Sequence, residues 1–221
     1  MAKRRKRKIA FWLLFLLLTG VVLFVIWKEV MQNDVYGVSF KKGNMVFQDT
    51  DLSVFEKEGI EITYAKIIYP TVSNGLCEKD DVSVIATNEN YGYFTDMQFE
   101  KGAFFNRKQA ERKLEVVVIN KRAAYALFGN NDCVGEIVYL NRMPYQVIGI
   151  AEEKQEDKAR IYISDQMLES LRLPNTGIGQ IWCKLPNMAD MTLTVSKLGY
   201  RVEDFDIIQR NFRWFLSNSL F

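Results

Sequence analysis

The sequence predicts an α+β fold, in which an N-terminal transmembrane helix precedes a mixed α/β domain outside the membrane. Three observations predict this fold. Residues 9–27 contain no charged side chain and follow an unbroken basic run at residues 3–8. The rest of the chain alternates short strand patterns with short amphipathic helix patterns. Helices that end at a glycine and lead into a strand recur near both ends of this outer part.

Residues 9–27 form the predicted membrane anchor. As a helix with about 1.5 Å of rise per residue, this stretch approaches the roughly 30 Å hydrocarbon core of a bilayer. Ile9 begins it and Trp27 ends it. The indole rings of Trp12 and Trp27 suit the two membrane interfaces. We therefore expect one helix that crosses the membrane once.

The basic run sets the expected orientation of the chain in the cell membrane. Residues 1–8 should form a cytoplasmic tail, which leaves residues 28–208 as an extracytoplasmic domain and 209–221 as an amphipathic C-terminal tail. A cleaved signal peptide is the alternative explanation of a basic and then apolar N-terminus. However, the apolar stretch is longer than a usual signal sequence, and no small-x-small cleavage site follows it.

One face of the predicted anchor has a glycine between two large apolar residues. Leu16, Gly20 and Phe24 follow one another at four-residue spacing, and Gly20 would allow another helix to approach closely. This face could support self-association or contact with a second membrane protein. The alternative is that it only contacts lipid.

The composition gives no support to catalysis, to a cofactor or to nucleic-acid binding. The chain has 29 basic and 27 acidic residues, no histidine and 3 cysteines. No C-x-x-C pair is present for a metal, and no G-x-S-x-G motif for a nucleophile. The acidic residues at 152, 153, 156 and 157 alternate with lysines, which is typical of a solvated loop. We predict no enzyme, no metal and no bound cofactor.

The first half of the outer domain should contain three strands and one clear helix. Thr50 is the expected N-cap of the helix, and Gly59 its left-handed end. The expected elements are strands at 35–40, 60–69 and 82–87, a helix at 50–58, a turn-rich stretch at 70–81, and a short helix or turn at 91–99.

The middle of the domain has the most regular pattern. Residues 116–119 form a continuous apolar run, typical of a strand buried on both faces. Asn120 should cap a helix at 121–128, and Gly129 should end it. Strands at 136–140 and 145–150 should follow, joined through 141–144. In the second strand we expect Tyr145, Val147 and Gly149 on one face, with Gln146, Ile148 and Ile150 on the other.

The C-terminal part repeats the helix-glycine-strand order. We expect a strand at 178–185, a helix at 191–198 behind the cap Asp190, and a further strand from Tyr200 after Gly199. The segment VFEKEGIEI aligns with TVSKLGYRV at the glycine. Either two related β-α-β units pack side by side, or the similarity is the chance recurrence of a common local pattern.

The middle of the chain resembles the outer domain of MacB/FtsX-type ABC transporter permeases, the MacB-like periplasmic core domain. That family has an F-x-x-G-R-x-F phrase, a buried strand, a helix ending in L-F-G, a V-G-x-x-I, and a strand pair ending in V-x-G-V. Ala103 stands where the family often has arginine. The matching motif residues here are Phe99, Gly102, Phe105, Leu127, Phe128, Gly129, Val134, Gly135, Ile137, Val147, Ile148, Gly149 and Ile150.

The resemblance implies porter-like β-α-β units and a non-enzymatic role in transport or mechanotransmission. The implied partners are an ABC ATPase and a multi-helix permease subunit, since the family's three further membrane helices have no counterpart in this sequence. A membrane-anchored sensor or cargo-binding module is the alternative function. Gly149 should allow close approach of two strands. The expected core residues are Phe99, Phe105, Val117, Ile119, Leu127, Phe128, Ile137 and Val147.

Overall fold

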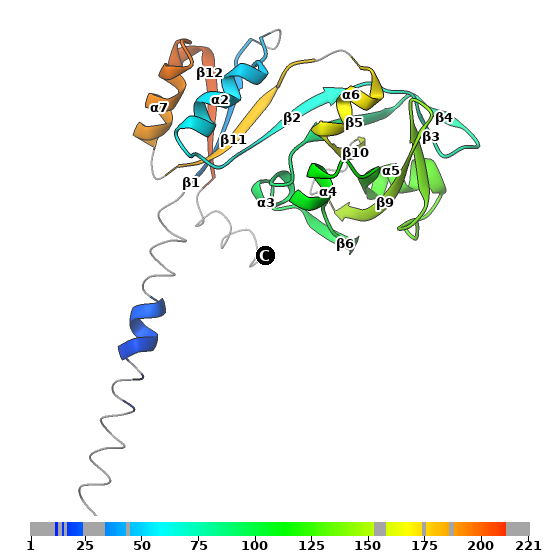
Figure 1. Ribbon diagram of the computed structural model, residues 1–221, viewed down its shortest axis with the longest axis horizontal. Coiled ribbons are helices and arrows are strands. Elements are labelled where there is room, and N and C mark those ends of the chain that lie inside the picture. The colour runs from blue at the N-terminus through cyan, green and yellow to red at the C-terminus, as the bar shows by residue number, and fades with distance from the viewer. Residues whose placement is uncertain are drawn as a thin grey trace, which may run out of the picture.

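The computed structural model shows two lobes joined by one shared strand (Figure 1). It describes residues 12, 15, 17–23, 34–42, 45–152, 158–173, 176–185 and 188–210. In these residues the strands form a continuous path in the order β12-β1-β11-β2-β5-β10-β7-β9-β8-β3-β4, with β6 paired to β9. Lobe 1 contains β12, β1, β11 and the first half of β2, and lobe 2 contains the rest.

Lobe 1 consists of two interleaved β-α-β units. The elements of the first unit are β1 (Asp34–Phe40), α2 (Asp49–Lys57) and β2 (Ile62–Ile68). Those of the second are β11 (Gln180–Leu185), α7 (Met188–Lys197) and β12 (Phe205–Arg210). β1 pairs antiparallel with both β11 and β12, and β11 pairs antiparallel with β2, so the two strands of each unit are parallel and separated by a strand of the other unit.

Helices α2 and α7 pack against the same side of this small sheet (Figure 1). Both end two residues before a left-handed glycine, Gly59 with φ 68° and Gly199 with φ 81°. The core between helices and sheet includes the fully buried Tyr36, Phe47 and Phe55. The two aligned sequence segments therefore occupy equivalent positions, in units that are interleaved rather than simply adjacent.

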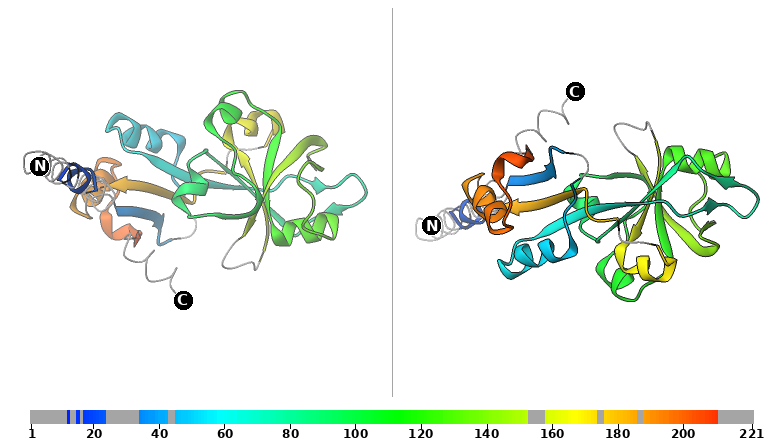
Figure 2. Two further views of the ribbon diagram at one scale, coloured as in Figure 1. Left: turned by 90° about the horizontal axis from the view of Figure 1, so that it is seen from below. Right: turned by 90° about the horizontal axis from the view of Figure 1, so that it is seen from above.

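Lobe 2 is a curved sheet with helices on both of its faces. Its strands are β3 (Val72–Ser73), β4 (Glu78–Lys79), β5 (Val82–Thr87), β6 (Gln98–Gly102), β7 (Val116–Asn120), β8 (Ile137–Leu140), β9 (Met143–Glu152) and β10 (Ala159–Ser164). Its helices are α3 (Tyr91–Phe94), α4 (Arg107–Glu111), α5 (Lys121–Phe128), a 3₁₀ turn η1 (Asp165–Met167) and α6 (Leu168–Leu171). Hairpin β3–β4 lies at the end of lobe 2 far from lobe 1 (Figure 2).

Two hydrophobic clusters stabilise lobe 2. The larger one contains Val117, Ile119 and Leu127, and packs α5 against the sheet. The smaller one contains Phe105 and Val118 on the opposite face. Together with the core of lobe 1, these are the hydrophobic clusters of the described residues, and the buried members of each lie within one lobe or on its part of the shared strand.

Strand β2 connects the lobes through its two halves. Its first half pairs with β11, where Tyr64 lies opposite Ile181. Its second half pairs with β5, where Lys66 lies opposite Ala86. A rotation of one lobe against the other must therefore deform β2 or the contacts around it.

The structure confirms the predicted bounds and caps of helix α5. Its bounds and those of β5 agree with the expected 121–128 and 82–87. The Asn120 side chain accepts a hydrogen bond from the Ala123 N–H at 2.9 Å, which is N-cap geometry. Gly129 has φ 75° at the C-terminal end.

Other helix caps were predicted wrongly. Helix α2 begins at Asp49 with Gln48 as its N-cap, because the Gln48 N–H donates to the Asp51 carboxylate at 2.8 Å. Thr50 therefore lies inside the first turn. Helix α7 begins at Met188, so Asp190 lies in its first turn and is not the N-cap. Its negative charge there interacts favourably with the helix dipole.

Several strand boundaries differ from the expectations. The turn-rich stretch at 70–81 contains the hairpin β3–β4, and the stretch at 91–99 divides into α3 and the start of β6. A 3₁₀ turn, η2 (Val202–Asp204), separates Gly199 from β12. β12 continues to Arg210, so residues 209 and 210 belong to this strand and not to the tail.

A bulge in β9 changes the expected alternation of its side chains. Val117 pairs with Val147 but Val118 pairs with Gly149, so Ile148 is the extra residue. Ile150 is consequently buried in the same cluster as Val147, contrary to the alternation we expected.

The hairpin β8–β9 corrects a further expectation. Its turn is only Asn141 and Arg142, with φ 49° and 67°, as in a type I′ turn. In β8 the residues Val138 and Leu140 point inward. Ile137 is 36% exposed and was wrongly expected in the core.

The predicted anchor lies largely outside the described residues. Trp12 and Gly20 are helical, whereas Ile9, Leu16, Phe24 and Trp27 are outside the described part, as are residues 153–157 and 211–221. Among the helices of the described residues, none is long and apolar enough to cross a membrane.

Candidate functional site

The motif glycines bring β6 and β9 into close contact in lobe 2. A Cβ on Gly149 would lie 2.6 Å from the Ala103 carbonyl oxygen. A Cβ on Gly102, which has φ 70°, would collide with the Ile148 carbonyl oxygen. Both positions therefore exclude a side chain. Gly149 does allow a close approach of two strands, but the strand that approaches β9 there is β6 and not the expected β8.

The other motif residues surround the end of α5. Leu127 and Val147 are buried in the larger hydrophobic cluster of lobe 2, and Phe128 packs against that cluster. The Gly135 N–H donates to the Val147 carbonyl at 2.8 Å, while Val134 is 43% exposed. These residues shape lobe 2, and they do not line the cleft described next.

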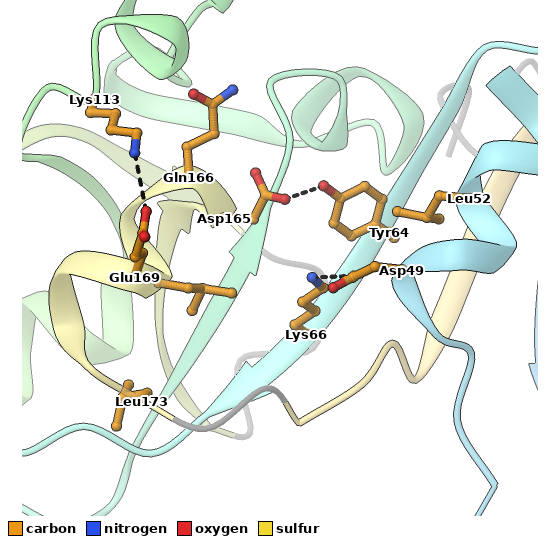
Figure 3. A pocket seen from close by; sticks show the side chains of 10 residues that line it. Asp49, Leu52, Tyr64, Lys66, Lys113, Asp165, Gln166, Glu169 and Leu173 are labelled. Atoms are coloured by element: carbon orange, nitrogen blue, oxygen red, sulfur yellow. Dashed lines mark hydrogen bonds and ion pairs between the residues drawn. The ribbon is translucent and has the colours of Figure 1, made fainter.

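A cleft of about 540 Å³ lies between the lobes beside β2 (Figure 3). Helix α2 of lobe 1 forms one wall, and η1 with α6 of lobe 2 forms the other. The lining residues are Asp49, Leu52, Tyr64, Lys66, Lys113, Asp165, Gln166, Leu168, Glu169 and Leu173.

Tyr64 connects the core of lobe 1 to a carboxyl group of lobe 2. Its ring is 7% exposed and belongs to the lobe 1 cluster. Its hydroxyl donates a short hydrogen bond to Asp165, which follows directly after β10 in lobe 2 (Figure 3). The phenol thus has an apolar ring on one side of the boundary and a polar partner on the other.

Lys66 makes a second contact between the lobes. It lies in the lobe 2 half of β2, and its ammonium is 2.5 Å from the carboxylate of Asp49 at the start of α2 (Figure 3). The Lys66 side chain is only 6% exposed, whereas that of Asp49 is 52% exposed. A buried ammonium needs such a partner because water cannot solvate it fully.

Burial and neighbouring charges shift the pKa values of the Tyr64–Asp165 pair. Desolvation raises the pKa of Asp165, and the hydrogen bond from Tyr64 and the charge of Lys66 only partly oppose this effect. Desolvation and the nearby Asp165 raise the pKa of Tyr64, so the phenol stays protonated and remains a donor.

The opposite face of β2 also has polar contacts between the lobes. Thr63 is fully buried, and its hydroxyl donates to the Asn88 side chain at 2.6 Å. Asn88 in turn donates to the Ile62 carbonyl at 3.0 Å. Thr87 donates a short hydrogen bond to the Tyr64 carbonyl. Polar groups on both faces therefore hold the strand where it passes from one lobe to the other.

These groups pair with one another and do not form a catalytic arrangement. In the described residues no three His, Cys, Asp or Glu side chains gather to hold a metal ion. Cys133 and Cys183 are buried free thiols whose pKa desolvation raises to about 11 and about 12, so neither is activated as a nucleophile.

Sequence reasoning did not find the cleft. Asp49, Tyr64 and Asp165 lie far apart in the chain, and no local pattern connects them. One signal was present. Ile62, Tyr64 and Ile68 share a strand face that is otherwise apolar, and Lys66 interrupts it with a charge.

The two ends of the described domain lie side by side in lobe 1. Strands β1 and β12 are antiparallel, with Val35 opposite Arg210. The chain therefore enters and leaves the domain at one end of one strand pair.

Comparison with known proteins decides the family. The sequence profile of the MacB-like periplasmic core domain matches residues 14–199. The chain belongs to this family. The MacB-like periplasmic core domain is a domain of ABC transporter permeases, as the sequence resemblance predicted.

Curated relatives and solved structures agree with this assignment. The macrolide export ATP-binding/permease protein MacB of Escherichia coli K12 is 32% identical over 119 residues, which are 51% of this chain and 18% of that protein. The chain thus matches about a fifth of the length of these MacB relatives.

Two solved structures share the fold. The periplasmic region of MacB from Actinobacillus actinomycetemcomitans has a TM-score of 0.66 at 16% identity, over 87% of this chain and 95% of that one. The extracellular domain of the ABC-type transporter YknZ from Gram-positive bacteria has a TM-score of 0.61 at 15% identity, over 79% of this chain and 99% of that one.

Proposed function

We propose that the chain is a non-enzymatic, single-pass subunit whose MacB-like domain works outside the membrane with an ABC ATPase and a multi-helix permease. Residues 9–27 anchor it, with the N-terminus in the cytoplasm. Its role is transport or the transmission of movement to a partner outside the membrane. Family membership supports a transport-related role.

The observation that carries this proposal is the position of the two ends of the described domain. Because Val35 and Arg210 are opposite each other on β1 and β12, segments that flank the domain act on the same strand pair of lobe 1. A displacement there reaches lobe 2 through β2, which belongs to both lobes. This geometry suits a domain that converts movement at its base into movement of its distal lobe.

Photo-crosslinking in native membranes tests the proposed partners. A photo-reactive residue replaces Leu16, on the face that includes Gly20 and Phe24, and Leu18 serves as the control position on another face. We expect adducts from position 16 with a multi-helix permease or a second copy of the chain, and copurification of an ATPase. The purified chain alone should neither bind nor hydrolyse ATP.

The alternative function has a different outcome in the same experiment. A membrane-anchored sensor or cargo-binding module would give no protein adduct from either position. It would instead bind a small ligand tightly as a purified monomer. That combination of results would replace the subunit proposal.

A further inference from the structure

The boundary between the lobes is polar, and this property determines how firmly the lobes are held. The three hydrophobic clusters place their buried residues on one side of it or the other. Relative motion is the default for two bodies without a large apolar interface. Contacts other than a common core must therefore hold lobe 1 and lobe 2 at the observed angle.

The groups that line the cleft provide such contacts. Tyr64 donates from lobe 1 to Asp165 in lobe 2, and Lys66 in the lobe 2 half of β2 pairs with Asp49 in lobe 1. The two contacts cross the boundary in opposite senses on the same face of β2. Since Lys66 and Asp165 are already engaged with partners inside the protein, the cleft is better explained by this pairing than by a ligand.

We propose that Asp49, Tyr64, Lys66 and Asp165 form a polar clasp that holds the lobes closed and opens when lobe 1 moves relative to lobe 2. Opening lets water reach Lys66 and Asp165, which offsets the loss of their partners. The lobes should therefore exchange between a closed form, in which both pairs are in contact, and an open form, in which water solvates these groups.

The energetic scale suits a device that movement of a partner can switch. A hydrogen bond that involves a charged group contributes enough to change an equilibrium by roughly tenfold. The two clasp contacts add to the Thr63–Asn88 hydrogen bond on the other face of β2, so the open form should be a minor state that is still reachable. A shared apolar core would fix the angle far more firmly.

The clasp goes beyond the proposed function and is tested without any partner. Spin labels are placed on full-length protein in lipid nanodiscs at Leu193→Cys in α7 and Tyr125→Cys in α5, which are 56% and 58% exposed. Cys77→Ser removes the exposed native thiol, and Cys133 and Cys183 are buried. Pulsed electron resonance then measures the distance between the lobes.

Two variants open the clasp, and one matched variant does not. Tyr64→Phe removes only the hydroxyl that binds Asp165. Asp49→Asn removes the charge that pairs with Lys66, at a half-exposed position where folding should be preserved. Lys197→Met is the control, because Lys197 pairs with Glu58 at 2.9 Å within lobe 1.

We expect Tyr64→Phe and Asp49→Asn each to raise the ratio of open to closed distances by roughly tenfold. Lys197→Met should keep the parent distribution. Parent-like distributions in both clasp variants, or equal broadening in the control, would overturn the clasp. Neither result depends on whether an ATPase or a permease binds the chain, so the proposed function is judged separately by crosslinking.

Discussion

Asp165 ionises in surroundings that favour its neutral form. Burial raises the pKa of its carboxyl group, Asp49 adds to this rise, and Tyr64 and Lys66 oppose it. The pKa of Asp165 is higher in the folded state than in an unfolded chain, where it is about 3.9. The group therefore makes its full contribution to stability only below the unfolded-state pKa. Its contribution is lost as the pH rises through the folded-state pKa.

This sign predicts the pH dependence of Asp165→Asn. The amide is neutral at every pH and can still accept from Tyr64. The stability of the variant relative to the parent should therefore improve as the pH rises from about 4 to 7. Denaturant unfolding of the full chain in detergent at several pH values measures this difference.

Asp132→Asn provides a control with the opposite sign. The hydrogen bond and charge of Lys101 lower the pKa of Asp132, so its contribution is present above about pH 4 and lost on acidification. Relative to the parent, this exposed variant should lose a little stability as the pH rises. The same pH slope in both variants would show that Asp165 is not destabilised by burial.

At the scale of elements, the contact of β6 with β9 gives a second prediction. A Cβ on Gly149 would lie 2.6 Å from the Ala103 oxygen and 3.0 Å from the Ala103 nitrogen. Backbone atoms cannot rotate away as a side chain can. Gly149→Ala should therefore lower the free energy of unfolding by about 1–3 kcal/mol, because overpacking forces a backbone shift.

Thermal unfolding of the full chain measures this effect. A loss of that size lowers the melting temperature by roughly 2–12 °C for a domain of this length. Gly179→Ala is the matched control, because nothing lies within 4 Å of its Cβ position and its φ is not positive. It should change stability by less than about 0.5 kcal/mol. Equal melting temperatures for the two variants would contradict the close strand contact.

The same elements show what sequence reasoning can reach. Helix α5 was predicted to the residue because Asn120 and Gly129 are local signals that act within one turn of the helix. The bulge at Ile148 has no local signal, since it depends on the pairing of β9 with β7 on one side and β6 on the other. Gly149 pointed to a close approach, but the pattern around it did not identify β6 as the partner.

The cleft was beyond local patterns for a similar reason. Tyr64 and Asp165 meet only because β2 and β10 both pair with β5. The N-terminus of α2 was also ambiguous in the sequence, because Gln48 and Thr50 are both possible caps. Only the side-chain geometry shows that Gln48 is the N-cap and that its N–H donates to Asp51. The mixed α/β fold of the domain and its family were therefore predictable, whereas the contacts between the lobes required the three-dimensional arrangement.

At the scale of the whole molecule, one exposed thiol can report which side of the membrane the domain occupies. Cys77 is exposed and lies in the β3–β4 hairpin, at the end of lobe 2 far from lobe 1 (Figure 2). Cys133 and Cys183 are buried, and desolvation raises their pKa to about 11 and about 12. A thiol reagent should therefore modify the folded chain at Cys77 first.

We expect a membrane-impermeant maleimide to label the chain on intact spheroplasts, because in the proposed orientation the basic run at 3–8 stays inside and the domain lies outside. Cys77→Ser should abolish the label.

In that background Ala2→Cys places a thiol in the predicted cytoplasmic tail, which should react only after the membrane is permeabilised. If residues 9–27 are an uncleaved anchor, as proposed, the labelled chain should also stay in the membrane fraction after an alkaline wash. Labelling of Ala2→Cys on intact spheroplasts would reverse the orientation, and recovery of a soluble chain beginning near residue 28 would show that the N-terminal segment is a cleaved signal peptide.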